Sequence, residues 1–552
     1  MRSVRPSAES ARILALPRRP ADAAPPEGYF ERWRRTPSGR GNFDLMPKQA
    51  QTLYELAEYG GAMGSLALGE GKTGIALLAG SVLGAERTVL LVAASVYAQV
   101  TEVDYPAWAE HWVLPPLRTD RGPGPGLWII KYTDLSSKDP KKHNALEEIA
   151  ATLVVSDESH TLARANIRRK RYRRYVNRAA PKVLNLSGTF MDRSIKDPAP
   201  LAADALGAGS PYPRTYADLD AWSWALDDLP ANSGLGVLGA FGKTLDEARD
   251  GFCRWVSETP GFVVSNGESC GAALRFGVRR LTIPGNVNQA LDDLRRFWVR
   301  PDGFELVSPL EFHRAARTLA LGFYLRWTEK APDEWLEARA AWASELSAFL
   351  KRSNRPGLDS PALVTEAAAT GKLGLRSYEK WAAVEKAFKP AGEVVWLDEF
   401  AARDAALWAT EPGKPGIVWS EHPSFGERVA ELAGVPWYGG GDRASSEILK
   451  EPGTRSMVAS VSSHFFGKNL QRFSRALITT PPGSARRAGQ TIGRIHRRGQ
   501  KADVVHVDFY LHTPEYQSAM AAARRNAEVN QRLTKERQKL VVGRWASPAP
   551  LP

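Results

Sequence analysis

The first residues suited to chemistry form a glycine-rich loop. An apolar stretch leads into the loop and a helical pattern follows it, the order typical of a phosphate-binding loop. Glycines let successive backbone N–H groups point at phosphate oxygens, and the following helix adds the positive end of its dipole. We expect Lys72 to reach the β- and γ-phosphates of a nucleotide and the Thr73 hydroxyl to bind Mg²⁺. Leu66 replaces the first glycine of the usual pattern, so a plain glycine-rich turn is the alternative. The loop residues are Gly69, Glu70, Gly71, Lys72 and Thr73.

Two adjacent carboxylates, Asp157 and Glu158, follow an apolar run about 85 residues later. The end of a buried strand is where ligands bind in an open α/β sheet. Asp157 is suited to hold Mg²⁺, and Glu158 to orient and deprotonate an attacking water. An ordinary acidic strand-to-loop junction is the alternative. Ser187 and Thr189, after the next apolar run, could hydrogen-bond both to this acidic pair and to a neighbouring lobe, or form a simple turn.

Two arginines stand out far along the chain. Arg494 and Arg497 are three residues apart, so on a helix they share one face. Such a pair can clamp the γ-phosphate and stabilise charge that develops during phosphoryl transfer. A basic helix on a solvated surface is the alternative. A surface role does not account for the glutamines and glycines that frame the pair, Gln490, Gly493, Gly499 and Gln500.

Two blocks of alternating pattern must position these residues. From Leu45 to about Pro284, and again from about Gly416 to Tyr510, short runs rich in Val, Ile and Leu alternate with helical stretches, as a parallel sheet covered on both faces requires. The stretch between them is mostly helical, and residues 1–40 lack a sustained period. The sequence thus predicts five parts: a flexible basic arm (1–40), a first lobe (41–285), a helical insert or linker (286–410), a second lobe (411–515), and a C-terminal helix and tail (516–552).

Seven segments follow one another along the chain: LMPKQ (45–49), GEGKT (69–73), VLLVAASVYAQVTEV (89–103), DESH (157–160), LSGT (186–189), SSHFFGKNLQRFSRALITT (462–480) and QTIGRIHRRGQ (490–500). In this order they resemble the motifs of the Swi/Snf-type branch of the superfamily 2 helicases and translocases. The resemblance covers about 45–285 and 415–510, and the general form is similar to the stand-alone motors of bacteriophages. The chain departs from the family before the glycines of motif I, in motif III, which continues as Phe190-Met191, and in the insert.

The resemblance implies an α/β fold of two RecA-like parallel-sheet lobes that bind ATP and Mg²⁺ between them. It implies that Gln49 reads adenine and that Gln490 lines the nucleotide site. It also implies that Arg494 and Arg497 reach the nucleotide from the second lobe, and that cyclic closure steps the protein along a nucleic acid. The residues expected to couple the lobes are Ser187, Thr189, Gly467 and Asn469.

Composition sets further bounds. Lys and Arg number 74 against 61 acidic residues, for a net charge of +13, which favours a polyanionic partner such as DNA although many basic proteins bind no nucleic acid. Cys253 and Cys270 match neither a zinc pattern nor a disulfide framework. Uninterrupted apolar runs stay well short of about 18 residues, so we expect no membrane span and a cytoplasmic protein of a bacterium or a phage-infected cell.

The basic run 167–178 and the tryptophans of the insert can each be interpreted as structural or as nucleic-acid-binding. The basic run 167–178, which interleaves two tyrosines with arginines, predicts a helix with charge on all sides that either contacts DNA or is solvated. The many tryptophans in and beside the insert favour core packing over base stacking. The leading hypothesis is a DNA-stimulated ATPase that translocates on DNA. A nucleic-acid-binding scaffold with a degenerate ATP site and an RNA helicase are the alternatives.

Overall fold

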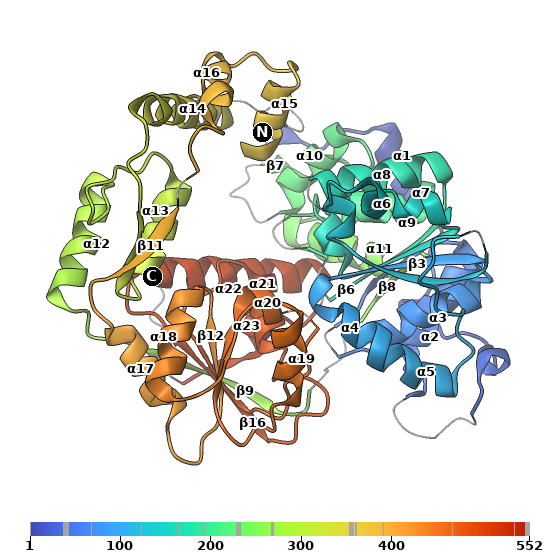
Figure 1. Cartoon of the computed structure of the whole chain (residues 1–552). Coiled ribbons are helices and arrows are strands. Elements are labelled where there is room, and N and C mark those ends of the chain that lie inside the picture. Colours follow the sequence, from blue (N-terminus) through green and yellow to red (C-terminus); the bar gives the residue numbers. More distant parts are fainter. Residues whose placement is uncertain are drawn as a thin grey trace.

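A computed structural model describes most of the chain, in two α/β lobes with an insert that extends from the left side to the top of the view and a helix running between the lobes (Figure 1). The predicted α/β architecture with two parallel sheets is confirmed, and it is consistent with two RecA-like lobes. The described residues are 2–36, 43–67, 69–122, 124–163, 166–188, 190–191, 194–227, 233–265, 270–352, 358, 361–389, 391–465, 467–534 and 536–546. Thr189, predicted to couple the lobes, lies outside them.

Lobe 1 is built on a six-stranded parallel sheet with the order β4-β3-β5-β6-β2-β8. Successive side chains of a strand point to opposite faces. Val89 and Leu91 accordingly pack in one hydrophobic core, and Leu90 and Val92 in the other. Both faces are covered, which is why these strands read as continuous apolar runs. The strands are β2 (Ala62–Ser65), β3 (Arg87–Val92), β4 (Gly126–Lys131), β5 (Leu153–Asp157), β6 (Lys182–Ser187) and β8 (Phe262–Val264).

Helices cover the two faces of this sheet. The helix after the glycine-rich loop is buried along most of its length, because it packs between the sheet and α2. The helices of lobe 1 are α1 (Ala8–Leu14), α2 (Pro47–Tyr59), α3 (Lys72–Leu83), α4 (Tyr97–Gln99), α5 (Tyr105–His111), α6 (Pro140–His143), α7 (Ala145–Ile149), α8 (Ile167–Ala179), α9 (Ala199–Leu206), α10 (Tyr216–Leu226) and α11 (Leu245–Ser257).

Lobe 2 carries a seven-stranded parallel sheet with the order β13-β14-β12-β15-β16-β9-β17. Its strands are β9 (Ala273–Arg279), β12 (Ile417–Ser420), β13 (Trp437–Tyr438), β14 (Met457–Ser460), β15 (Arg475–Ile478), β16 (Val504–Tyr510) and β17 (Arg544–Trp545). Its helices are α17 (Phe400–Ala409), α18 (Pro423–Ala433), α19 (Asp442–Lys450), α20 (Val461–His464), α21 (Ala485–Ile492), α22 (Pro514–Thr534) and α23 (Lys539–Val542).

The boundaries of lobe 2 differ from those expected from the sequence. Strand β9, which precedes the insert and was expected in lobe 1, pairs with β16 along its whole length. Helix α17, expected in the insert, packs in the core of lobe 2 through Ala401, Ala402 and Ala405. An apolar run predicts a strand but not the sheet that the strand joins, because the pairing partner is set by tertiary contacts.

The insert is helical with one added pair of strands. Strands β10 (Phe323–Trp327) and β11 (Gly392–Trp396) pair antiparallel, and the helices are α12 (Gly285–Phe297), α13 (Pro309–Leu319), α14 (Asp333–Arg352), α15 (Pro361–Ala369) and α16 (Arg376–Val384). Trp335 packs edge-on against Trp327, Trp381 and Phe388 in a small core. Core packing is thus the role of these tryptophans, as predicted.

The N-terminal arm is docked on lobe 1, so the predicted disorder is wrong for residues 2–36. Ile13 on α1 is fully buried in a core of lobe 1, and Glu9 binds Arg12 and Arg214. Strand β1 (Arg2–Ser3) pairs with β7 (Ser233–Gly234). The arm has few apolar residues, but buried ion pairs such as Arg19 with Glu55 add contacts that a periodicity argument does not count. Among the described residues, no helix has the length and apolar character to cross a membrane.

Candidate nucleotide site between the lobes

The glycine-rich loop follows β2 and leads directly into α3. Gly69 and Gly71 have φ angles of +97° and +65°, a region that side chains other than glycine rarely adopt. Lys72 is the first residue of the helix and is buried. Its Nζ donates to the carbonyl oxygens of Leu66 at 3.0 Å and Ala67 at 3.3 Å. The loop thus closes on its own lysine, and the residue that departs from the usual pattern, Leu66, supplies one of the acceptors.

Gln49, predicted to read adenine, is tied to this loop. Its Nε2 donates to the carbonyl of Gly71 at 2.9 Å, and its Oε1 accepts from Met46 N at 2.7 Å. A Cβ added at Gly71 would lie only 2.1 Å from Gln49 Nε2, so glycine is required there for this contact as well. Gln49 therefore lies next to the phosphate loop and is 2% exposed.

The acidic pair lies at the carboxyl ends of the central strands. Asp157 ends β5, and Glu158 follows in a left-handed conformation with φ +52°. Glu158 Oε2 is 3.2 Å from His160 Nδ1 and accepts from Ser187 Oγ at 3.3 Å. Ser187 Oγ and His160 Nδ1 are themselves 3.0 Å apart. Ser187 thus contacts the acidic pair, one of the two contacts expected of it from the sequence.

Burial and charge perturb both carboxylates. Burial and the neighbouring Glu158 raise the pKa of Asp157. Burial alone would also raise the pKa of Glu158, but the hydrogen bond from His160 and the positive charges of Lys72, His160 and Arg494 outweigh it and lower the pKa. One carboxylate is thus held in its ionised form beside another whose proton is retained more easily. Such opposed shifts are typical of acid–base sites.

Lobe 2 contributes the arginines. The spacing of Arg494 and Arg497 predicted that they share one face of a helix. This prediction is wrong, because helix α21 ends at Ile492 and both arginines lie in the turns after it. They converge all the same, because Nη1 of each donates to the carbonyl of Lys468, at 3.4 and 3.5 Å. Burial and the neighbouring Arg497 lower the pKa of Arg494 to about 9, whereas the charge of Glu158 acts in the opposite direction. The guanidinium of Arg494 thus interacts electrostatically with an acid of lobe 1.

Several contacts join the two lobes at this place. Lys468 Nζ donates to the carbonyls of Ser95 in lobe 1, at 3.0 Å, and Ser445 in lobe 2, at 2.8 Å. Gly467, a predicted coupling residue, lies so close to lobe 1 that an added Cβ would meet Val96 Cγ1 at 1.7 Å. Glycine at 467 therefore permits the close approach of the lobes.

Sequence reasoning missed two charged residues of this region. Asp104 ends a π-helical turn (Val100–Asp104) in lobe 1, where burial raises its pKa to about 6 and the charge of Arg497 opposes this. Lys468 is 2% exposed and accompanies the predicted Gly467. The sequence signal for Asp104 was its place directly after the segment that resembles motif Ia (89–103), but a single acid in a helical pattern is usually interpreted as a solvated residue.

The residues present fit Mg²⁺ bound together with a nucleotide. The predicted ligands are Thr73 and Asp157. Thr73 is half-buried on the first turn of α3, after the loop that follows β2, and Asp157 is the last residue of β5, so both lie at the carboxyl edge of the sheet. Within the described parts of the chain, no group of three His, Cys, Asp or Glu residues could hold a metal alone. Mg²⁺ commonly takes one or two protein ligands together with phosphates and waters, so a larger set is not required. Gln490 is buried with both amide atoms unpartnered among the described residues, as expected of a residue that awaits a polar ligand.

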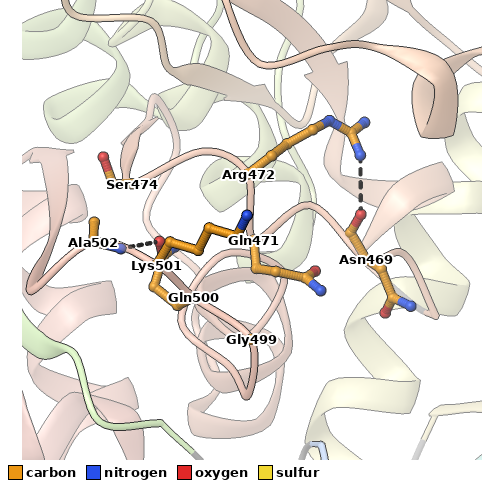
Figure 2. Close-up of a pocket in the computed structure, with 8 residues that line it drawn as sticks. All are labelled: Asn469, Gln471, Arg472, Ser474, Gly499, Gln500, Lys501 and Ala502. Atoms are coloured by element: carbon orange, nitrogen blue, oxygen red, sulfur yellow. Dashed lines mark hydrogen bonds between the residues drawn. The ribbon is translucent and has the colours of Figure 1, made fainter. Parts of the chain in front are cut away.

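Asn469 directly follows Lys468, whose carbonyl accepts hydrogen bonds from Arg494 and Arg497. It is exposed and lines a pocket of about 550 Å³ on lobe 2. Figure 2 shows that the side chains of Arg472 and Lys501 belong to this pocket, and that Arg472 donates to the carbonyl of Asn469. This contact of Asn469 lies within lobe 2, and its predicted role in coupling the lobes stays a prediction. The remaining lining residues are Gln471, Ser474, Gly499, Gln500 and Ala502.

The sequence predicted that the basic helix α8 carries charge on all sides, but one side of it is buried. Tyr172 and Tyr175 are buried in a core of lobe 1, and Arg169 is buried against Asp204. A buried arginine is tolerated where an acid neutralises it. The acid is Asp204 on the next helix, which is too distant in sequence for a local pattern to indicate the pairing. The outer face of α8 retains four exposed cations, Lys170, Arg173, Arg174 and Arg178.

Comparison with models of known protein families gives no match for this chain, and no curated protein matches its sequence.

Proposed function

We propose that the chain is a DNA-stimulated ATPase of the superfamily 2 type that uses ATP hydrolysis to move along DNA. The observation that carries the proposal is the opposed placement of charge at the lobe junction. Lobe 1 presents Lys72 and the Asp157–Glu158 pair, and lobe 2 presents Arg494 within electrostatic reach of Glu158. Phosphoryl transfer requires this combination, because its catalysis is largely positioning and charge stabilisation.

Binding of ATP would begin at the glycine-rich loop. Lys72 would exchange the carbonyl oxygens of Leu66 and Ala67 for phosphate oxygens, while the N–H groups at the start of α3 favour the same negative charge. Gln49, which already contacts Gly71, would read the adenine edge as the family resemblance implies. Thr73 and Asp157 would hold Mg²⁺, which when bound neutralises charge on the phosphates.

Hydrolysis would then proceed by attack of water on the γ-phosphorus. As the water oxygen bonds to phosphorus, the bond from phosphorus to the bridging oxygen breaks, and ADP leaves with that electron pair. Glu158, which its lowered pKa keeps ionised at neutral pH, would orient the water and accept its proton as the bond to phosphorus forms. Arg494 and Arg497 would stabilise the charge that develops on the transferred group. The products are ADP and phosphate.

Coupling to movement would use the contacts between lobes. Ser187 contacts Glu158, and Lys468 joins the carbonyl of Ser95 in lobe 1 to the turn that holds the arginines. A change in the nucleotide would thus alter how the lobes meet. The net charge of +13 and the resemblance of 490–500 to the DNA-tracking branch support DNA as the track.

The test measures phosphate release by the full chain with no nucleic acid, single-stranded DNA, duplex DNA, branched DNA and RNA. We expect DNA to stimulate hydrolysis more than RNA does, and Lys72→Ala to abolish it. Hydrolysis that is indifferent to DNA would contradict the proposed track. Absence of hydrolysis under every condition would indicate a scaffold with a degenerate ATP site instead.

A further inference from the structure

The C-terminal segment, residues 514–546, runs from lobe 2 into lobe 1 and back. Tyr516 and Met520 on α22 pack in the core of lobe 2, whereas Leu533 near its end packs in a core of lobe 1. Leu540 on α23 is again in the core of lobe 2, and β17 adds to the edge of its sheet. Figure 1 shows α22 running between the two lobes. Both ends of this segment are thus anchored in lobe 2, and its middle is buried in lobe 1.

Glu536 lies in this middle part and carries a carboxylate to the base of the phosphate loop. Its side chain accepts a hydrogen bond from Ser65 Oγ, and the residue is 3% exposed. Ser65 is the last residue of β2, and the next two residues supply the carbonyls that hold Lys72. The other carboxylate oxygen, Oε2, is buried without a hydrogen-bond partner among the described residues. Burying an acid so incompletely paired is costly, which indicates a role at this place.

Three residues further along, Lys539 contacts the arginine turn. Lys539 Nζ donates to His496 Nδ1 at 2.7 Å, and His496 Nε2 donates to the carbonyl of Ala272 at 2.8 Å. His496 lies between Arg494 and Arg497 in the chain. Because extended residues span at most about 3.6 Å each, the Cα atoms of Glu536 and Lys539 cannot separate by more than about 11 Å. The phosphate loop and the arginine turn are therefore joined by a short bridge.

We propose that Glu536 is a positioning residue for the phosphate loop and that, with Lys539, it couples the loop to the turn that carries Arg494 and Arg497. This inference rests on the proposed ATPase. Glu536 fixes the end of β2 through Ser65, and Lys539 fixes His496. To draw apart at the nucleotide site, the lobes would have to pull the buried Glu536 out of lobe 1 or break the hydrogen bond between Lys539 and His496.

The first test is a double-mutant cycle on phosphate release by the full chain at saturating DNA. We expect Glu536→Ala and Ser65→Ala each to lower kcat about tenfold with little change in KM, and the double variant to be no worse than either alone. Glu536→Gln should restore most of the rate, because its amide oxygen still accepts from Ser65. The matched control is Glu528→Gln, an exposed glutamate on α22, which should behave as wild type. Additive losses, or full activity in Glu536→Ala, would overturn the inference.

The second test does not depend on activity. Fluorescent labels at Tyr59→Cys in lobe 1 and Leu407→Cys in lobe 2 occupy exposed positions, 54% and 72% in the native chain, while the native cysteines are buried. We expect the distribution of distances between the labels to broaden in Glu536→Ala and not in Glu528→Gln. An unchanged distribution would contradict the coupling even if the chain hydrolyses ATP. A broadened one in a chain without ATPase activity would contradict the proposed function and leave the bridge supported.

If Glu536→Ala unfolds below the assay temperature, Lys539→Met replaces it in both tests. Lys539→Met keeps the length of the side chain and removes the hydrogen bond to His496. We expect it to broaden the same distance distribution and to lower kcat severalfold, at an unfolding temperature near that of wild type. Wild-type values for both readouts would contradict the role of the bridge.

Discussion

The two lobes hold their charged residues in different ways. In lobe 1 the acids belong to a network of side chains, in which Glu158 accepts from Ser187 and pairs with His160. In lobe 2 the arginines donate to backbone carbonyls, and burial lowers the pKa of both. A buried cation with only neutral acceptors is costly to hold. The charges that favour it, Glu158 for Arg494 and Asp104 for Arg497, are supplied by lobe 1.

The difference indicates how the lobes depend on each other. Lobe 1 balances much of its own charge, since Lys72 and His160 lie near the acids. Lobe 2 brings positive charge that becomes favourable only next to lobe 1 or a bound phosphate. A nucleotide bound between the lobes would therefore favour their approach, and release of the nucleotide would weaken the attraction between them.

The largest effect is expected from removing the charge of lobe 2. Arg494→Ala and Arg497→Ala should each lower kcat by about 10³-fold or more, the range typical of arginines that stabilise phosphoryl transfer. ATP binding, measured with a fluorescent analogue, should weaken far less. Arg498→Ala is the control, because this neighbour is exposed. If Arg498→Ala were as damaging as the other two, the distinction between exposed Arg498 and the pair of buried Arg494 and half-buried Arg497 would be wrong.

A slightly smaller effect is expected from the acid of lobe 1. Glu158→Gln keeps the shape of the side chain but removes the base, which contributes about 10²- to 10⁴-fold in typical enzymes. The variant should lose turnover and still bind ATP. Glu148→Gln, an exposed glutamate on α7, provides the control. Failure of Glu158→Gln to bind ATP would exclude its assignment as the catalytic carboxylate.

The sequence predicted the two parallel sheets because strands covered on both faces read as apolar runs, as in β3 and β5. It also selected residues that the structure brings together at the lobe junction, Lys72, Asp157, Glu158 and Arg494, because each follows or flanks such a run. This agreement depends on local patterns, which a single sequence carries.

The features that the sequence missed depend on distant contacts. Strand β9 joins the sheet of lobe 2 across more than 200 residues, and Glu536 meets Ser65 across 471. The burial of Arg169 depends on Asp204, and the docking of α1 on Arg214. The contacts of charged residues leave no periodic signal, because one charged residue in a polar stretch has the same pattern whether its partner is a protein group or water. The sequence of a strand likewise does not specify the distant strand with which it pairs.

A moderate effect is expected at the contact between Gln49 and the phosphate loop. Gln49→Ala removes the hydrogen bond to Gly71, which is worth about 1 kcal/mol, and any contact with adenine. We expect KM for ATP to rise about tenfold while kcat changes little. Glu58→Ala, on the exposed side of the same helix, should leave KM unchanged. A loss in kcat alone would assign Gln49 to the chemical step and not to binding.

The smallest effect on turnover is expected where charge is balanced within one lobe. Burial alone would raise the pKa of Glu9, but hydrogen bonds from Arg12 and Arg214 lower it to about 2. An acid with a lowered pKa in the folded state stabilises the fold at pH values above its ordinary pKa, and this stabilisation is lost as the pH falls from about 4.5 towards 2. Glu9→Gln should lower the free energy of unfolding at pH 7 by about 1–2 kcal/mol and leave kcat unchanged. It should also reduce the loss of stability on acidification, measured by denaturant unfolding at pH 7 and at about pH 3, which lies within that range. A fall in kcat would contradict the comparison, because it would show that a charge pair confined to lobe 1 also controls the junction.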